Sequence, residues 1–109
     1  MVKVIVFREQ GTVVGFELTG HADQGAYGED IACAGISAIA QTALLGITDV
    51  LKLDAVWSQQ EGHLRCELNR ETAPEDREKA AVVFDTMVAG LSSLKEAYPK
   101  SLKFSYREV

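Results

Sequence analysis

The chain has 109 residues, of which 47% are hydrophobic and 25% charged, and its formal net charge is −5 at pH 7. This length suits a single domain over residues 1–109 with one core. The acidic balance argues against nucleic acid as a partner, because phosphate binding requires a basic face. No run approaches the roughly 18 apolar residues that a membrane-spanning helix needs. We therefore expect no direct nucleic-acid partner and no membrane.

The first residues, MVKVIVF, are apolar, but no cationic region precedes them and no small-residue cleavage site follows. They predict a first strand rather than a signal peptide, which places the protein in the cytoplasm. The two cysteines, Cys33 and Cys66, are too few for a disulfide framework. In a reducing compartment both are expected to be free thiols.

In chain order, residues 2–7 and 13–18 have the β-branched and aromatic content of strands, joined by the turn-forming segment REQGT. They predict a hairpin. From Ile31 to Leu51 the chain is rich in alanine, leucine and isoleucine and apolar nearly all the way round, as in a helix buried on several sides. Residues 53–58 and 62–69 predict a second hairpin.

The C-terminal third begins with Thr72-Ala73-Pro74-Glu75, which matches a capping box. Apolar residues at spacings of three and four then predict a helix from about 74 to 97. Alternation at 102–107 predicts a last strand. The order ββαββαβ indicates an α+β fold, a single-domain two-layer sandwich with a mostly antiparallel sheet of about five strands and two main helices.

The stretch from Thr19 to Gly35, TGHADQGAYGEDIACAG, carries the chemistry of interest. Asp30 is the predicted N-cap of the helix from Ile31, so Cys33 is expected in the first turn, where free N–H groups and the helix dipole stabilise a thiolate. Cysteines at such positions or beside a histidinium have pKa values lowered from about 8.5 to roughly 3.5–7.5. His21 is the base that such a nucleophile needs.

Spacing alone leaves a plainer interpretation open, because a cysteine in an alanine-rich helix is most often a small core residue and a loop histidine is usually solvated. Ser37 and Gln41 lie one and two turns beyond Cys33 on the same stripe. Their side chains either bond back to the helix backbone or line a cleft.

A metal site is the chief chemical competitor, since His21, Cys33, His63 and Cys66 together have the composition of a two-Cys, two-His zinc site. Strand alternation opposes it, because His63 and Cys66 point to opposite faces. Cys66 shares its face with leucines and is expected in the core, whereas His63 is expected to face solvent. The sequence therefore predicts no metal and no cofactor.

The residues G-H-A at 20–22, Gly28 and D-I-A-C-A-G-I-S-A at 30–38 resemble the signature of the bacterial ribosomal-processing cysteine proteases. The resemblance extends over essentially the whole chain. It implies a homodimeric cytoplasmic endopeptidase that removes the N-terminal extension of large-subunit ribosomal protein number twenty-seven, cutting after an aromatic residue. The catalytic dyad then falls on His21 and Cys33.

Within this resemblance Gly20 matches a loop hinge, and Asp30 and Ser37 match polar positions near the site. We expect His21 to take the proton of Cys33 and the thiolate to attack a peptide carbonyl. Asp30 is the first candidate to orient His21, with Asp23 and Glu29 as alternatives.

Two further expectations concern partners. The strongly apolar first helix leaves more apolar surface than one sheet covers, which favours a dimer independently of the resemblance. A non-enzymatic alternative is a ribosome-associated binding module in which Cys33 is structural.

Overall fold

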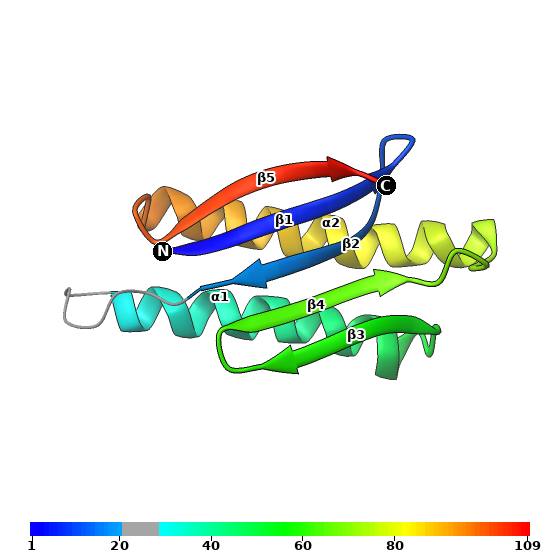
Figure 1. Cartoon of the computed structure of the whole chain (residues 1–109), viewed down its shortest axis with the longest axis horizontal. Helices are drawn as coiled ribbons and strands as arrows, with labels where there is room; N and C mark the ends of the chain where they lie inside the picture. Colours follow the sequence, from blue (N-terminus) through cyan, green and yellow to red (C-terminus); the bar gives the residue numbers. More distant parts are fainter. Residues whose placement is uncertain (21–28) are drawn as a thin grey trace.

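The computed structural model describes residues 1–20 and 29–109, which form one five-stranded sheet with two helices on one side of it (Figure 1). The strands are β1 (Val2–Glu9), β2 (Thr12–Thr19), β3 (Ala55–Gln60), β4 (His63–Leu68) and β5 (Leu102–Glu108). The helices are α1 (Glu29–Leu45), continued by the short π-helix η1 (Gly46–Val50), and α2 (Pro74–Ala97). The predicted α+β fold and the order ββαββαβ are confirmed.

The strand order in the sheet is β3-β4-β2-β1-β5. β1 with β2, β2 with β4, and β3 with β4 are antiparallel pairs, whereas β5 runs parallel to β1. A parallel neighbour requires a long crossover connection, and α2 supplies it. The two hairpins therefore lie side by side, with β3 and β5 as the edge strands.

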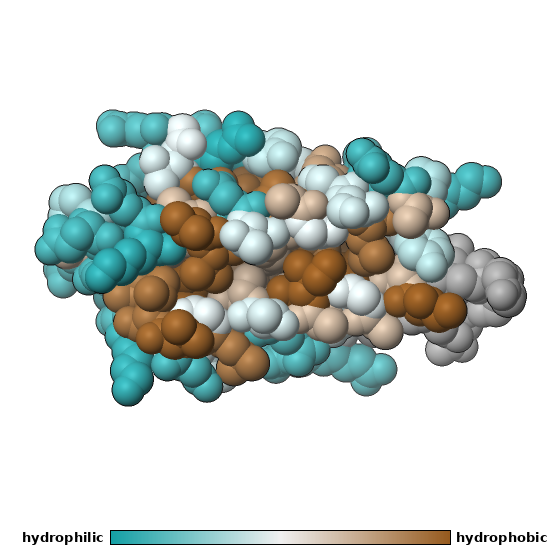
Figure 2. Space-filling model, turned by 180° about the vertical axis from the view of Figure 1, so that it is seen from behind, coloured by the Kyte–Doolittle hydropathy of each residue, from teal (hydrophilic) through white to brown (hydrophobic). Residues whose placement is uncertain are grey.

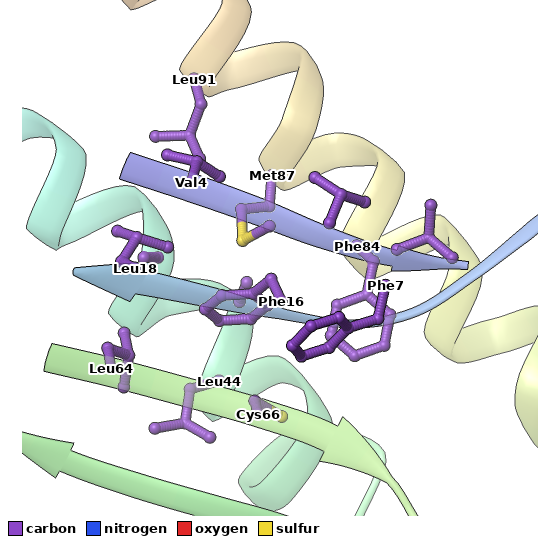
Figure 3. Close-up of a cluster of buried hydrophobic side chains, with 14 of the residues drawn as sticks. Val4, Phe7, Phe16, Leu18, Leu44, Leu64, Cys66, Phe84, Met87 and Leu91 are labelled. Carbon is purple, nitrogen blue, oxygen red and sulfur yellow. The ribbon is translucent and has the colours of Figure 1, made fainter. Parts of the chain in front are cut away.

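The core lies between the sheet and the helices, and Figure 3 shows part of it. Alternate residues of β1, β2 and β4 face the helices because successive side chains of a strand point to opposite faces. Phe16 of β2 meets Phe84 of α2 edge to face, with ring centroids 6.0 Å apart. Around this pair the core is aliphatic: Val4, Val6, Leu18, Leu64, Ile36, Leu44, Ile47, Met87 and Leu91.

On the opposite face of the sheet, the aromatic residue Phe7 is fully buried. Its strand partner is Gly15, where an added Cβ would lie 3.1 Å from the Phe7 ring and 2.5 Å from the Cys66 carbonyl oxygen. The guanidinium carbons of Arg65 and Arg107 lie 4.8 and 5.6 Å from the ring centroid. Glycine thus makes room for the ring, and two arginines cover it by cation–π contact.

The predicted capping box is wrong. Ala73 is the N-cap of α2 and makes no side-chain capping bond, and Pro74 occupies the first helical position. The Thr72 hydroxyl instead donates to the carbonyl oxygen of Asn69 at 2.6 Å. Pro74 has no N–H that needs a capping partner, and its φ is already helical. The Thr72 hydroxyl is therefore available for the turn that precedes the helix.

The segment Ile31–Val50 differs from the expectation about membrane spans. It has 20 residues and a mean hydropathy of 1.7, which is long and apolar enough to cross a membrane by length and composition. Ser37, Gln41 and Thr48 interrupt the run in the sequence. In the fold, one side of this segment packs on the sheet and on α2, so its composition also fits a core helix.

We predict that Cys66→Ala lowers the free energy of unfolding by about 1–2 kcal/mol, because Cys66 is fully buried on the helix-facing side of β4. Burial, with a smaller contribution from Glu67, raises the pKa of the Cys66 thiol from 9.0 to about 12. Between pH 9.0 and about pH 12 the Cys66 thiol ionises in the unfolded chain but keeps its proton in the folded one. The free energy of unfolding of the parent should therefore fall as the pH rises through this range. Denaturant titrations should therefore show the difference between parent and variant shrinking from pH 8 to pH 10. A difference that stays constant would contradict the assignment.

Candidate active site

Cys33 lies one turn into α1 and is half-buried. Because the helix already includes Glu29, Asp30 is inside it, and the prediction that Asp30 is the N-cap of a helix from Ile31 is wrong. Cys33 is accordingly past the first turn in which it was predicted. Acidic residues are favourable at the positive end of a helix, which explains the earlier start. The Cα–Cβ bond of Cys33 still tilts toward that end.

The thiol opens onto a cleft of about 490 Å³ between the N-terminal half of α1 and the β3–β4 hairpin. One wall is the stripe Cys33, Ser37 and Gln41 of α1. The other wall is the continuous segment 59–64, which contains the hairpin turn, and Val2, Leu18 and Ile36 form an apolar floor. A cleft of this size accepts a few residues of a peptide.

Ser37 and Gln41 were predicted either to bond to the helix backbone or to line a cleft, and they line the cleft. Gln41 Nε2 donates a hydrogen bond to Ser37 Oγ at 2.7 Å. A line of polar groups therefore runs away from Cys33 along an otherwise apolar helix.

Gly20 borders the same cleft and has a φ of +99°. Its N–H donates to the carbonyl oxygen of Gly62 at 3.0 Å, and an added Cβ would lie 2.7 Å from the carbonyl oxygen of Met1. Only glycine fits this conformation and this spacing without strain. The end of β2 is thereby held against the β3–β4 turn beside the cleft.

His63 borders the cleft, and its side chain lies on the sheet face opposite the helices, where it was predicted to face solvent. Its Nε2 lies 2.7 Å from Glu17 Oε2, and its side chain is only 27% exposed. The neighbouring Arg65 is 3.8 Å from the same carboxylate oxygen. Within residues 1–20 and 29–109, the buried Nδ1 has no hydrogen-bond partner. Alternation put His63 on the correct face, but only the register of β4 on β2 brings Glu17 to it.

The other half of the predicted site lies outside the described residues. His21, Asp23 and the glycines at 25 and 28 belong to this segment, as do the side chains of Glu29 and Asp30. The two ends of the segment are placed, because Gly20 lines the cleft and Glu29 is one turn before Cys33. The pairing of His21 with Cys33 and the orienting role of Asp30 remain predictions.

The described part of the chain contains no group of three His, Cys, Asp or Glu residues that could hold a metal ion. The register confirms that His63 and Cys66 face opposite sides of the sheet, since His63 pairs with Thr19 and Cys66 with Phe16. Cys66 is confirmed as a core residue. What the cleft offers is therefore one accessible thiol, polar side chains and an apolar floor, an arrangement suited to nucleophilic attack on a bound peptide.

Comparison with known proteins gives a consistent result. The family model described as cysteine protease Prp matches residues 1–103. Relatives from Staphylococcus aureus and Bacillus subtilis, both named ribosomal processing cysteine protease Prp, are each 28% identical to this chain. The alignment covers 94% of this chain and 95% of the S. aureus protein, and 84% and 83% for B. subtilis.

Solved structures show the same fold. The S. aureus protease in complex with a substrate peptide matches with a TM-score of 0.82 at 24% identity, over 98% of this chain and all of that chain. The same protease with a covalently linked product peptide matches with a TM-score of 0.80 at 25% identity and the same coverage. A family match over nearly the whole chain and a thiol open to a cleft argue against the binding-module alternative. The chain belongs to the Prp family of cysteine proteases.

Proposed function

We propose that this protease removes the N-terminal extension of large-subunit ribosomal protein number twenty-seven, cutting after an aromatic residue. The observation that carries the proposal is the placement of Cys33 in a peptide-sized cleft. The substrate class is supported by the relatives, which are named ribosomal processing proteases. Ribosomal proteins are made in the cytoplasm, so the proposal places the enzyme there.

In the proposed mechanism, His21 takes the proton of the Cys33 thiol, and the thiolate attacks the carbonyl carbon of the scissile bond. His21 then gives that proton to the leaving amine as the C–N bond breaks, which leaves the N-terminal fragment on Cys33 as a thioester. Water, deprotonated by His21, hydrolyses the thioester and restores the thiol. The proposal requires the segment that carries His21 to bring it to the cleft, whose edge Gly20 forms.

The negative oxygen of the tetrahedral intermediate needs hydrogen-bond donors. The N–H groups of the first turn of α1 have no partners inside the helix, and the Cα–Cβ bond of Cys33 tilts toward them. They are the proposed oxyanion donors. Asp30 is the first candidate to orient His21, with Asp23 and Glu29 as alternatives, and Gly20 and Ser37 support the site.

We also propose that the enzyme is a homodimer joined through its helices. Figure 2 shows apolar residues gathered along the helix side of the molecule. Between α1 and α2 lies a groove of about 540 Å³, lined mainly by Ala38, Ile39, Val82, Val83, Met87 and Gly90. Val82 is 67% exposed at this groove. A second copy would cover these side chains and remove them from water.

Cys33→Ala and His21→Ala should each lower kcat/KM at least ~10³-fold, because each removes one member of a nucleophile and base pair. The assay is cleavage of a peptide that spans the extension and carries an aromatic residue at the cut. Cys33→Ala should unfold at the temperature of the parent, since alanine favours helix and is smaller. Cys66→Ala is the matched control and should cleave like the parent. Full activity of Cys33→Ala would refute the proposal.

For the dimer, sedimentation at micromolar concentration should give twice the chain mass of 11.9 kDa. Val82→Glu should produce a folded monomer, because it puts a charge in the groove at an exposed position. Val56→Glu is the control, since Val56 is 68% exposed but lies on the sheet face opposite the helices. A parent monomer, or dissociation by both variants alike, would contradict the helix-side interface.

A further inference from the structure

Gln41 lies two turns along α1 from Cys33, and the proposed mechanism does not use it. Its Nε2 donates to Ser37 Oγ at 2.7 Å, and both side chains line the cleft that contains the Cys33 thiol. Gln41 is exposed and Ser37 is half-buried. The hydrogen bond therefore lies at the solvent-exposed wall of the cleft that contains Cys33.

Ser37 differs in its hydrogen bonding from the threonines of the helices. A helical serine or threonine commonly donates to the carbonyl oxygen four residues earlier. Three threonines do this: Thr42 at 2.7 Å, Thr48 at 3.1 Å and Thr86 at 2.6 Å. The Ser37 oxygen accepts from Gln41, and its hydrogen meets no acceptor in residues 1–20 and 29–109. The Ser37 hydroxyl lines the cleft and can donate its hydrogen to a ligand bound there.

We propose that Gln41 is a positioning residue for the substrate. Its amide occupies an acceptor site of the Ser37 oxygen, which directs the Ser37 hydrogen into the cleft, where it donates to a backbone carbonyl of the bound peptide. This inference rests on the proposed function, because it takes the cleft as the peptide site.

The spacing indicates which carbonyl is bound. Cys33 and Ser37 are four residues apart, which is ~6 Å along a helix. An extended peptide rises ~3.3 Å per residue, so this distance corresponds to about two residues. Ser37 thus holds the carbonyl of a residue about two positions from the scissile bond. An extended peptide has a carbonyl oxygen at every residue, so this contact sets register along the cleft rather than side-chain specificity.

The direction of the hydrogen bond gives a sharp test. Gln41→Glu has nearly the same shape, but an ionised carboxylate only accepts, so the Ser37 hydrogen would turn toward position 41 and no longer toward the bound peptide. In Gln41→Lys the ammonium group can only donate. It would still donate to the Ser37 oxygen, so the Ser37 hydrogen would still point toward the bound peptide. Both residues favour helix, which keeps α1 intact.

We expect Gln41→Glu to lower kcat/KM for the peptide roughly five- to tenfold, the equivalent of one neutral hydrogen bond. The loss should appear mainly in KM, because the contact is made before and during reaction. Gln41→Lys should stay within about threefold of the parent. The rate at which iodoacetamide alkylates Cys33 should be the same in all three proteins, since the nucleophile is untouched.

A double-mutant cycle separates hydrogen-bond direction from charge. Ser37→Ala alone should lower kcat/KM as much as Gln41→Glu does. Adding Gln41→Glu to Ser37→Ala should lower kcat/KM no further. The proposal is overturned if Gln41→Glu cleaves like the parent or if Gln41→Lys lowers kcat/KM as much as Gln41→Glu does. It is also overturned if Gln41→Glu still lowers kcat/KM in the Ser37→Ala background. Failure of the proposed function would look different, because the parent itself would not cleave the peptide.

Discussion

The antiparallel register between β2 and β4 is the constraint on which the site depends. It pairs Gly15 with Glu67 at one end and Thr19 with His63 at the other, and the bond from the Gly20 N–H to the Gly62 carbonyl continues it by one step. This register brings the β3–β4 turn opposite the N-terminal half of α1. A slip by one residue would turn Phe16 and Leu18 out of the core and dismantle the wall that faces Cys33.

The same register explains why the His63 side chain is fixed by Glu17 and why the Cys66 thiol is buried away from the cleft. Glu17 and His63 meet on the open side of the sheet at 2.7 Å, whereas Cys66 faces the helices among leucines. Burial raises the pKa of the Cys66 thiol to about 12, so it stays protonated at neutral pH. The two cysteines thus differ in accessibility, because one lies in a strand of the core and the other on a helix at the cleft.

Most of the fold could be predicted from the sequence, because the spacing of apolar residues in a long segment distinguishes a helix from a strand. The helix predicted from about 74 to 97 and both hairpins agree with the structure, as does the stripe from Cys33 to Gln41. Helix starts were less predictable, since acidic residues before Ile31 extend α1 and Pro74 replaces a cap. The wall formed by residues 59–64 and the His63–Glu17 pair could not be predicted, because both depend on strand order.

The central claim is that Cys33 forms the covalent bond with the substrate, and mass spectrometry of the enzyme during turnover tests it most directly. Acid quenching in the steady state with the ribosomal-extension peptide should trap a thioester. Digestion should then place the N-terminal substrate fragment on the peptide that contains Cys33 and leave Cys66 unmodified. Cleavage that proceeds with the fragment on Cys66, or on any residue other than Cys33, would contradict the account.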